Sequence, residues 1–202
     1  MLAAQHEIRS QLHPQLQDLC FRVPDVLRLV AKVGGAAPDW KKRNFPPAFQ
    51  PLCEEIDPDL SGAALVREFN GVKFIPVIVN ALRLACELDI LFLRRELPGG
   101  LIKKPKDEYG GDIDNRLKVL FDALRPPENA SGLPKNAQFK SDQKSMLCLL
   151  EDDALITKFQ VESDTLLGID LYETANPKDV VLVIRVTIKR TAFSLANMQF
   201  AE

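Results

Sequence analysis

The sequence has few of the side chains that most often bind zinc or carry acid–base chemistry. It contains only two histidines, His6 and His13, and its four cysteines are far apart, with no C-x-x-C pair: Cys20, Cys53, Cys86 and Cys148. This spacing argues against a zinc site and a disulfide framework, and it fits a reducing cytoplasm. Because both histidines lie in one N-terminal segment, a histidine-based hydrolytic triad is not expected. Any catalysis is predicted to rest on carboxylates and lysines.

Long apolar runs and a secretory leader are also missing. No apolar run approaches the ~20 residues that a membrane-spanning helix needs. The first residues, MLAAQHEIRSQLH, lack a basic start that leads into an apolar stretch. Hydrophobic residues make up 46% of the 202 residues, which is enough for one ample core. We therefore predict a soluble, globular, cytoplasmic protein without a membrane partner.

The chain as a whole lacks the basic surplus that is usual in nucleic-acid-binding proteins. The formal net charge is −2 and the pI is about 5.8. Residues 94–118 differ from this average, because seven Lys/Arg stand there against five Asp/Glu. That segment hints at a basic patch, although a solvated charged surface is the simpler interpretation.

The N-terminal third is predicted to be a helical arm followed by an irregular connector. Apolar residues recur at three- and four-residue spacing over residues 5–33, and Pro24 is expected to break the helix. Residues 34–62 begin with a glycine pair and are rich in proline, which is typical of a connector. We therefore divide the chain into an arm and connector, residues 1–60, and a main domain, residues 61–202.

The main domain is predicted to be α+β, with the order β-β-α-β-β and a mixed or antiparallel sheet. Residues 71–79 and 84–93 have strand patterns, and Pro76 is expected to place the first of them at a sheet edge or a bulge. Later strands are expected between residues 154 and 167 and over residues 179–190, where apolar side chains alternate. An amphipathic helix separates the two pairs, with an apolar stripe of Leu117, Leu120, Phe121 and Leu124. Residues 126–148 are polar and irregular and look like an insertion.

Two aspartates two positions apart precede this helix in the segment GGDIDNRLK. If Asp112 and Asp114 are extended, both carboxylates lie on one face. Oxygen donors of this kind suit Mg²⁺, and Asp114 is also a candidate helix N-cap. Asn115 can orient a ligand or a water. Lys118 follows Asp114 by one helical turn, so its ammonium can stabilise a phosphate.

A second acidic group, EDD at residues 151–153, is predicted to begin a strand. Strand parity places Asp153 on the face of Leu155 and Phe159, where a carboxylate needs a partner or a metal. If this strand lies beside Asp112, the site gains a third ligand. The simpler alternative is that D-x-D-N is a helix cap, that EDD is a turn and that Lys118 is solvated. Each motif taken alone favours this alternative.

The combined pattern resembles the RusA family of Holliday junction resolvases, whose core reads D-x-D-N-x-x-K, a helix continuing to D-A-L, then D-D before a strand. The matching positions are Asp112, Asp114, Asn115 and Lys118 in DIDNRLK, Asp122 in FDAL, and Asp152 and Asp153 in EDDALI. The resemblance covers about residues 72–190. The sequence departs from the family in the length of residues 126–148 and in its N-terminal arm.

The resemblance implies a small homodimeric α/β endonuclease that uses Mg²⁺ and cuts four-way DNA junctions symmetrically. It implies that Asp112, Asp114 and Asp153 are metal ligands and that Lys118 is a catalytic lysine. Because a junction is two-fold symmetric, paired nicks need two active sites and hence a dimer.

We therefore predict a Mg²⁺- or Mn²⁺-dependent endonuclease that acts on branched DNA in recombination and repair. Asp152 is expected to accompany the three metal ligands. Nucleic-acid contacts are expected from Arg94, Arg95, Lys103, Lys104, Arg116 and Lys158. Two alternatives stay open. One is a non-catalytic nucleic-acid-binding module with the same fold, and the other is an interaction protein that docks a partner through the arm and residues 126–148.

Overall fold

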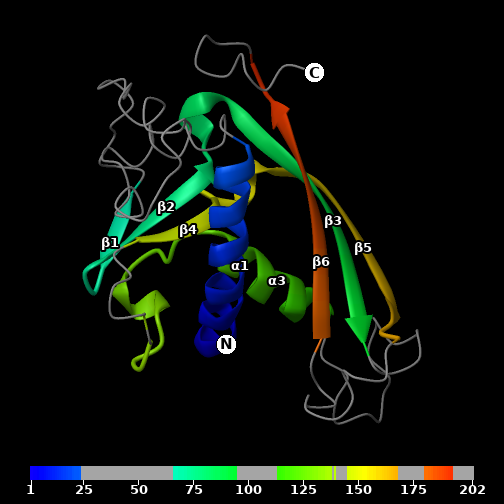
Figure 1. Ribbon diagram of the computed structural model, residues 1–202, viewed down its shortest axis with the longest axis horizontal. Coiled ribbons are helices and arrows are strands. Elements are labelled where there is room, and N and C mark those ends of the chain that lie inside the picture. The colour runs from blue at the N-terminus through cyan, green and yellow to red at the C-terminus, as the bar shows by residue number, and fades with distance from the viewer. Residues whose placement is uncertain (24–65, 95–112, 138, 140–144, 168–179, 193–202) are drawn as a thin grey trace.

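The described part of the chain is α+β, with two α-helices and two three-stranded mixed sheets. The computed structural model describes residues 1–23, 66–94, 113–137, 139, 145–167 and 180–192, without the side chains of residues 94, 113 and 114. In Figure 1 the two sheets diverge from the short turn that joins β2 to β3, and both helices lie in the angle between them.

Helix α1 (Leu2–Arg22) forms the first half of the predicted arm. It passes Pro14 without a break and ends where Val23 becomes extended, with φ −120° and ψ 94°. A residue that precedes proline is disfavoured in the α region, and Pro24 follows Val23. The predicted break at Pro24 is therefore confirmed. The predicted restart of the helix, and the connector up to residue 65, lie outside the described residues.

The first sheet has the order β1-β2-β4 and consists of β1 (Arg67–Phe69), β2 (Val72–Ile78) and β4 (Ser145–Leu150). β1 and β2 form an antiparallel hairpin, whose turn residues Asn70 and Gly71 both have positive φ. Asn-Gly is the pair that such a hairpin turn prefers. β2 and β4 pair in parallel.

Proline in β2 lies where the strand has only one neighbour. β1 pairs with residues 72–74, whereas Pro76 is paired with Cys148 of β4 alone among the described strands. A proline cannot donate to a strand ladder, so it is tolerated where one side of the strand needs no donor. The predicted edge position of this strand is wrong, because β2 lies between β1 and β4, but Pro76 itself has a strand partner on one side only among the described residues.

The second sheet has the order β5-β3-β6 and consists of β3 (Leu84–Arg94), β5 (Ile156–Thr165) and β6 (Val180–Arg190). β5 pairs with β3 in parallel and β6 pairs with it antiparallel. The predicted alternation in β3 and β6 is confirmed. Even-numbered residues from 84 to 92 are buried, and those from 182 to 188 pack against the same core.

A bulge in β5 changes the face of two residues. The paired register shifts between Cys86 and Glu87, which leaves Thr157 as the extra residue. Ile156 therefore packs against the core, while Thr157 is exposed and donates its hydroxyl to the carbonyl of Cys86 over 3.0 Å. The alternation predicted along residues 155–161 is wrong at this point, because one extra residue inverts the parity of the strand.

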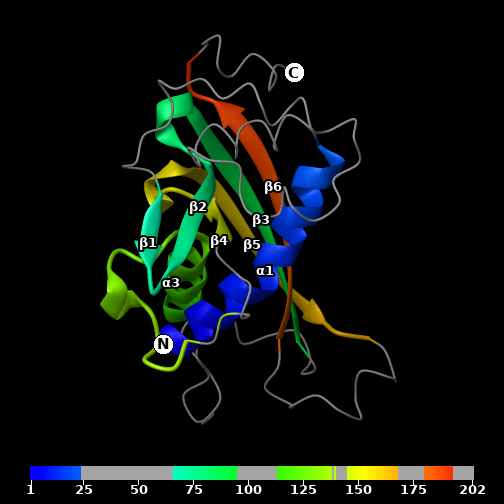
Figure 2. The ribbon, with the colours of Figure 1, turned by 60° about the vertical axis from the view of Figure 1, so that its left-hand side comes forward.

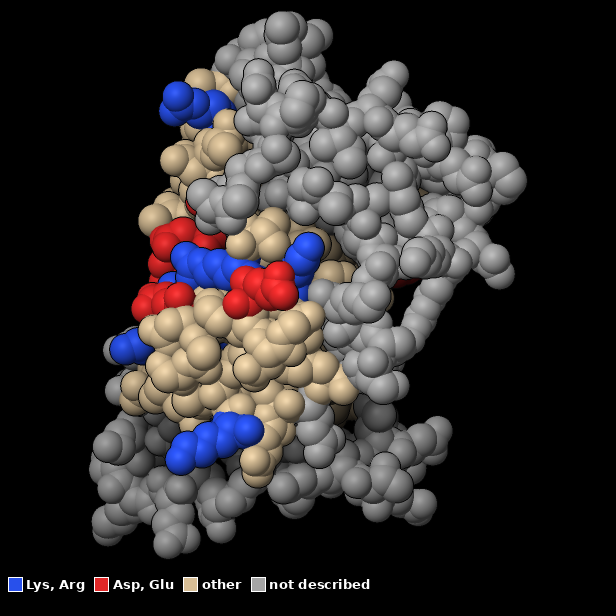
Figure 3. Space-filling model, turned by 90° about the vertical axis from the view of Figure 1, so that its left-hand side faces the viewer, with Lys and Arg blue, Asp and Glu red and all other residues tan. Residues whose placement is uncertain are grey.

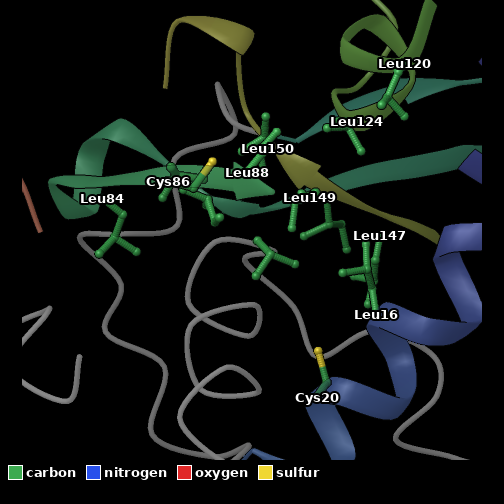
Figure 4. Packing of buried hydrophobic residues seen from close by; sticks show 14 of the residues in the cluster. Leu16, Cys20, Leu84, Cys86, Leu88, Leu120, Leu124, Leu147, Leu149 and Leu150 are labelled. Carbon is green, nitrogen blue, oxygen red and sulfur yellow. The ribbon is translucent and has the colours of Figure 1, made fainter. Parts of the chain in front are cut away.

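Helix α3 (Ile113–Leu124) joins the two sheets through the core. Its predicted apolar stripe is confirmed, because Leu120 and Leu124 are fully buried and Leu117 and Phe121 pack at the margin. Figure 4 shows the cluster, to which both helices and strands of both sheets contribute. Burying one leucine stabilises a fold by about 1.5–3 kcal/mol, so this shared cluster holds the helices and the sheets together.

α1 covers the outer edge of β4. The Nδ1 atom of His13 accepts a hydrogen bond from the backbone N–H of Leu147 over 3.0 Å. Uncovered edge strands present unpaired backbone groups, and a helix laid along the edge satisfies one of them here. Figure 2 shows the N-terminal end of α1 beside α3.

Part of the expected insertion, residues 126–148, belongs to the folded structure. It contains the 3₁₀ helix η6 (Ala130–Gly132) and the start of β4. The residue after η6, Leu133, is buried in a second small cluster together with Val72, Phe74, Met146 and Cys148.

The expected β-β-α-β-β order is incomplete, since the described elements run α1-β1-β2-β3-α3-β4-β5-β6. β1 has only three residues, and β4 is buried at every position, so it shows no alternation. Strands buried on both faces have continuous apolar sequences. This explains why the sequence pattern of residues 145–150 did not predict a strand. One mixed or antiparallel sheet was expected, whereas the described strands form two sheets, each of them mixed.

Candidate functional site

The D-x-D-N-x-x-K motif coincides with the start of α3. The helix begins at Ile113, so Asp114 lies in its first turn and not at the N-cap position, which corrects that prediction. Asp112 lies outside the described residues. Asn115 and Lys118 are both exposed, while the apolar stripe of the same helix is buried. The described polar residues of the motif therefore face solvent at the N-terminal half of α3, where the helix dipole favours anions such as phosphate.

The acidic pair forms a turn and not the start of a strand. Asp152 is the N-cap of the 3₁₀ helix η7 (Asp153–Leu155), and its Oδ1 accepts a hydrogen bond from the N–H of Ala154 over 2.9 Å. This bond, helped by Asp153 and by the charges of Arg125 and Arg67, lowers the pKa of Asp152 despite partial burial. The side chain of Asp153 is exposed, so the prediction that strand parity turns it towards the core is wrong.

The acidic pair lies towards the C-terminal end of α3. η7 contacts α3, and the carboxylates of Asp152 and Asp153 both act on the charge of Arg125, the residue that follows the helix. Asp114 and Arg125 are eleven residues apart, which corresponds to about 16 Å along a helix axis. Asp114 lies at the N-terminal end of α3, and the acidic pair lies near the C-terminal end.

A ring contact supports the same placement. Phe121, in the last turn of α3, contacts Phe159, the fourth residue of β5. The C-terminal part of α3 therefore lies against the first half of β5, which η7 immediately precedes.

A buried polar network fastens the C-terminal end of α3 to α1. Gln5 Nε2 donates to Asp122 Oδ2 and Arg9 Nε donates to the carbonyl of Arg125, each over 3.0 Å. Arg9 also donates to the carbonyl of Asp122, and Arg125 pairs with Asp122 over 2.8 Å and with Glu128 over 2.8 Å. Carbonyls of a last helical turn lack partners within the helix, and Arg9 supplies them.

Burial and charge act in opposite directions in this network. Arg9 is 3% exposed, and burial lowers its pKa although Cys148 and Asp122 oppose the change. Burial also acts to lower the pKa of Arg125, but hydrogen bonds to Glu128 and Asp122 outweigh it and raise that pKa. Both guanidinium groups therefore stay charged. Sequence reasoning missed the network, and its signals were the polar pair Gln5 and Arg9 one turn apart on α1 and the Asp–Arg pair three apart at the end of α3.

The predicted nucleic-acid contacts are only partly described. Arg94 is the last residue of β3, and its side chain is not described; Arg95, Lys103 and Lys104 lie outside the described residues. Arg116 is half-buried on α3, and Lys158 is exposed on β5 opposite Glu87. On the face shown in Figure 3, described Lys/Arg and Asp/Glu side chains are intermingled and form no continuous basic patch.

The described residues hold three free, buried cysteines. Burial raises the pKa of Cys20 and Cys148 to about 12 and that of Cys86 to about 11. Thiols of this kind are inert near neutral pH. No group of three or more His, Cys, Asp or Glu side chains gathers at a metal-binding distance within the described ranges. Neither Asp112 nor the side chain of Asp114 belongs to those ranges.

Comparison with known proteins identifies no relative, because no protein-family model, curated protein or solved structure matches the chain. No helix in the described part of the chain is long and apolar enough to cross a membrane.

Proposed function

We propose that the protein is a Mg²⁺- or Mn²⁺-dependent endonuclease of the RusA type that cleaves branched DNA as a homodimer. The observation that carries the proposal is the placement of the D-x-D-N-x-x-K motif. Its described members Asn115 and Lys118 are exposed on the N-terminal half of a helix whose other face is anchored in the core. A rigid helix that presents polar side chains at its positive end suits work on a phosphate.

The proposal gives each residue of the motif a role. Asp112 and Asp114 hold the metal through oxygen donors, and Asp153, beside Asp152, is the third ligand that the family pattern assigns. Bound Mg²⁺ would activate water and neutralise the leaving oxygen. Lys118 stands one turn after Asp114 and holds its charge against the scissile phosphate, where preorganised charge lowers the barrier to cleavage. A Mg²⁺ ion contacts its ligands at about 2.0–2.1 Å, whereas Asp153 lies near the C-terminal end of α3, beside Arg125, and Asp114 lies at its start. The proposed site therefore rests on Asp112 and Asp114 and does not require Asp153.

The proposal is tested with purified protein on four-way, flap and single-stranded DNA, with and without Mg²⁺. We expect metal-dependent, symmetric nicks in the four-way junction. Asp114→Asn is expected to abolish cleavage and to leave folding and junction binding intact, because it removes charge and not bulk. The matched control is Asp89→Asn, which changes an exposed aspartate of β3 and leaves cleavage unchanged. Full activity of Asp114→Asn rules out the proposed chemistry.

A second candidate is a non-catalytic module that binds nucleic acid or a protein partner. The observation in its favour is the structural use of the acidic pair, in which Asp152 caps η7 and Asp153 lies near the Arg125 charge. Under this function the protein cuts no junction with or without Mg²⁺, and any binding of junctions is independent of the metal. The same assay therefore separates the two functions.

A further inference from the structure

A partly exposed aromatic pair lies on the side of α3 that faces β5. The rings of Phe121 and Phe159 meet edge to face, with centroids 5.4 Å apart and an interplanar angle of 70°. Phe159 is nevertheless 51% exposed, although it projects from the core side of β5, opposite Leu88. Aromatic pairs of this geometry are worth about 0.5–1.5 kcal/mol beyond burial, so Phe121 fixes the orientation of Phe159. The result is an oriented ring with part of its surface open to solvent.

The aromatic pair adjoins the exposed lysine of the motif. Phe121 follows Lys118 by three positions, and residues three apart are neighbours on a helix surface. Lys118 is exposed, so a cation lies one turn along α3 from the ring that holds Phe159. We call Lys118, Phe121 and Phe159 the α3–β5 strip.

The described acidic side chains near the strip do not cancel its charge; the side chain of Asp114, one turn before Lys118, is not described. Asp122 is one turn after Lys118, but its carboxylate is occupied by Arg125 and Gln5. Glu162 differs from Phe159 by an odd number of positions in the regular part of β5 and so lies on the opposite face. Among the described side chains, the strip therefore offers one exposed cation and one flat apolar surface.

This combination matches the chemistry of an unpaired nucleotide. A single-stranded nucleic acid presents a negative phosphate beside a planar base, and proteins that bind it combine cations with aromatic side chains on which bases stack. A paired base is stacked within its duplex and has no free face. A partner of this kind occurs wherever a branched or single-stranded substrate leaves bases unpaired.

We propose that Phe159, held by Phe121, stacks on an unpaired base of the nucleic acid whose phosphate Lys118 contacts. This inference rests on the proposed function and extends it, because it assigns a substrate feature, an unpaired base near the cut, to a named side chain. Phe121 acts as a positioning residue and Phe159 makes the contact.

The test measures binding of short fluorescent oligothymidylates to the full chain by anisotropy in EDTA, so that no cleavage occurs. One oligomer carries all its bases, and a second has abasic sites. Because one stacked base contributes about 1–3 kcal/mol, Phe159→Ala is expected to weaken binding of the intact oligomer about tenfold. Phe159→Trp, which keeps a flat ring, is expected to bind like the wild type. The matched control is Val183→Ala on the outer face of β6, where the side chain is also 51% exposed, and it is expected to change nothing.

The abasic oligomer identifies stacking as the cause. The wild type is expected to bind it about tenfold more weakly than the intact oligomer, whereas Phe159→Ala is expected to bind both equally. Equal loss on both oligomers overturns the inference, and so does wild-type affinity in Phe159→Ala. If the wild type cleaves four-way junctions and Phe159→Ala binds normally, only this inference fails. If the wild type neither binds any DNA nor cleaves it, the proposed function fails as well.

Discussion

The two ends of α3 are built in opposite ways. At the C-terminal end, Asp122 and Arg125 have their charges paired, and Arg9 from α1 donates to both of their carbonyls. At the N-terminal end, Asn115 and Lys118 stand exposed to solvent. The polar groups at the C-terminal end anchor the helix, whereas those at the N-terminal end face solvent.

The difference separates structural from functional polar residues. Polar groups that fold a protein are buried with partners, because an unsatisfied buried group costs about 1–3 kcal/mol. Exposed polar groups on a rigid element contribute little to stability and are available for a ligand. Asp122 matches the family pattern as well as Lys118 does, yet its contacts give it a structural task. Substitutions at the two ends should therefore separate activity from stability.

The largest effect is expected at the exposed end. Lys118→Ala removes a charge that the proposal places at the scissile phosphate, so the cleavage rate is expected to fall by about 10²–10³. The free energy of unfolding, from urea titration, should change by less than about 0.5 kcal/mol, as is usual for surface sites. Lys189→Ala, an exposed lysine of β6, is the control and should keep full activity. If Lys118→Ala lost stability and kept its activity, Lys118 would have a structural and not a functional role.

The next effect is expected at the buried end. Arg9→Ala removes the donor to the backbone carbonyls of Asp122 and Arg125, so the free energy of unfolding is expected to fall by about 3 kcal/mol. Urea unfolding monitored by circular dichroism measures it. Arg22→Ala on the same helix breaks an exposed pair with Asp18 and should cost about 0.5 kcal/mol or less. Equal effects of the two substitutions would show that the network does not anchor α3.

The smallest effect concerns Asp152. Removal of its capping carboxylate in Asp152→Ala is expected to destabilise the protein by about 0.5–1 kcal/mol at pH 7. Because the N–H of Ala154 lowers the pKa of Asp152, this contribution is present above the unfolded-state pKa of about 4 and disappears as pH falls through the lower folded-state pKa. Urea titrations of both proteins from pH 7 to pH 2.5 measure the difference. A difference that grows on acidification would contradict the cap.

As a control, Asp153→Ala changes the neighbouring exposed carboxylate, which caps nothing in the described structure. Its effect on stability should stay within about 0.5 kcal/mol at every pH tested. Metal is left out of these titrations, so that any role of Asp153 in metal binding does not enter the comparison.

The sequence predicted the parts of the fold that one periodic face controls. The stripe from Leu117 to Leu124 and the alternation in β3 and β6 depend on one buried face, which periodicity reports directly. β4 was missed because it is buried on both faces, and β1 because it has three residues. Asn70 and Gly71 carried a hairpin signal that identifies β1.

The arrangement of the site depended on information that is not local. Strand parity predicted the wrong face for Asp153. The 3₁₀ helix η7 lies before β5, and the extra residue Thr157 reverses the alternation of faces along the strand. The separation of Asp114 from the acidic pair is set by the packing of β5 and η7 against the C-terminal end of α3, which no motif encodes. The Gln5–Arg9 contact to α3 likewise joins residues more than 110 positions apart.

The central claim is that the N-terminal end of α3 binds a divalent metal, and calorimetric titration with Mg²⁺ and Mn²⁺ tests it without any assumption about substrate. The account predicts that the wild type binds metal and that Asp114→Asn and Asp112→Asn lose it. If Asp153 is the third ligand, Asp153→Asn loses it too. Absence of metal binding by the wild type, or unchanged binding by Asp114→Asn, would contradict the account and leave the motif as a helix start.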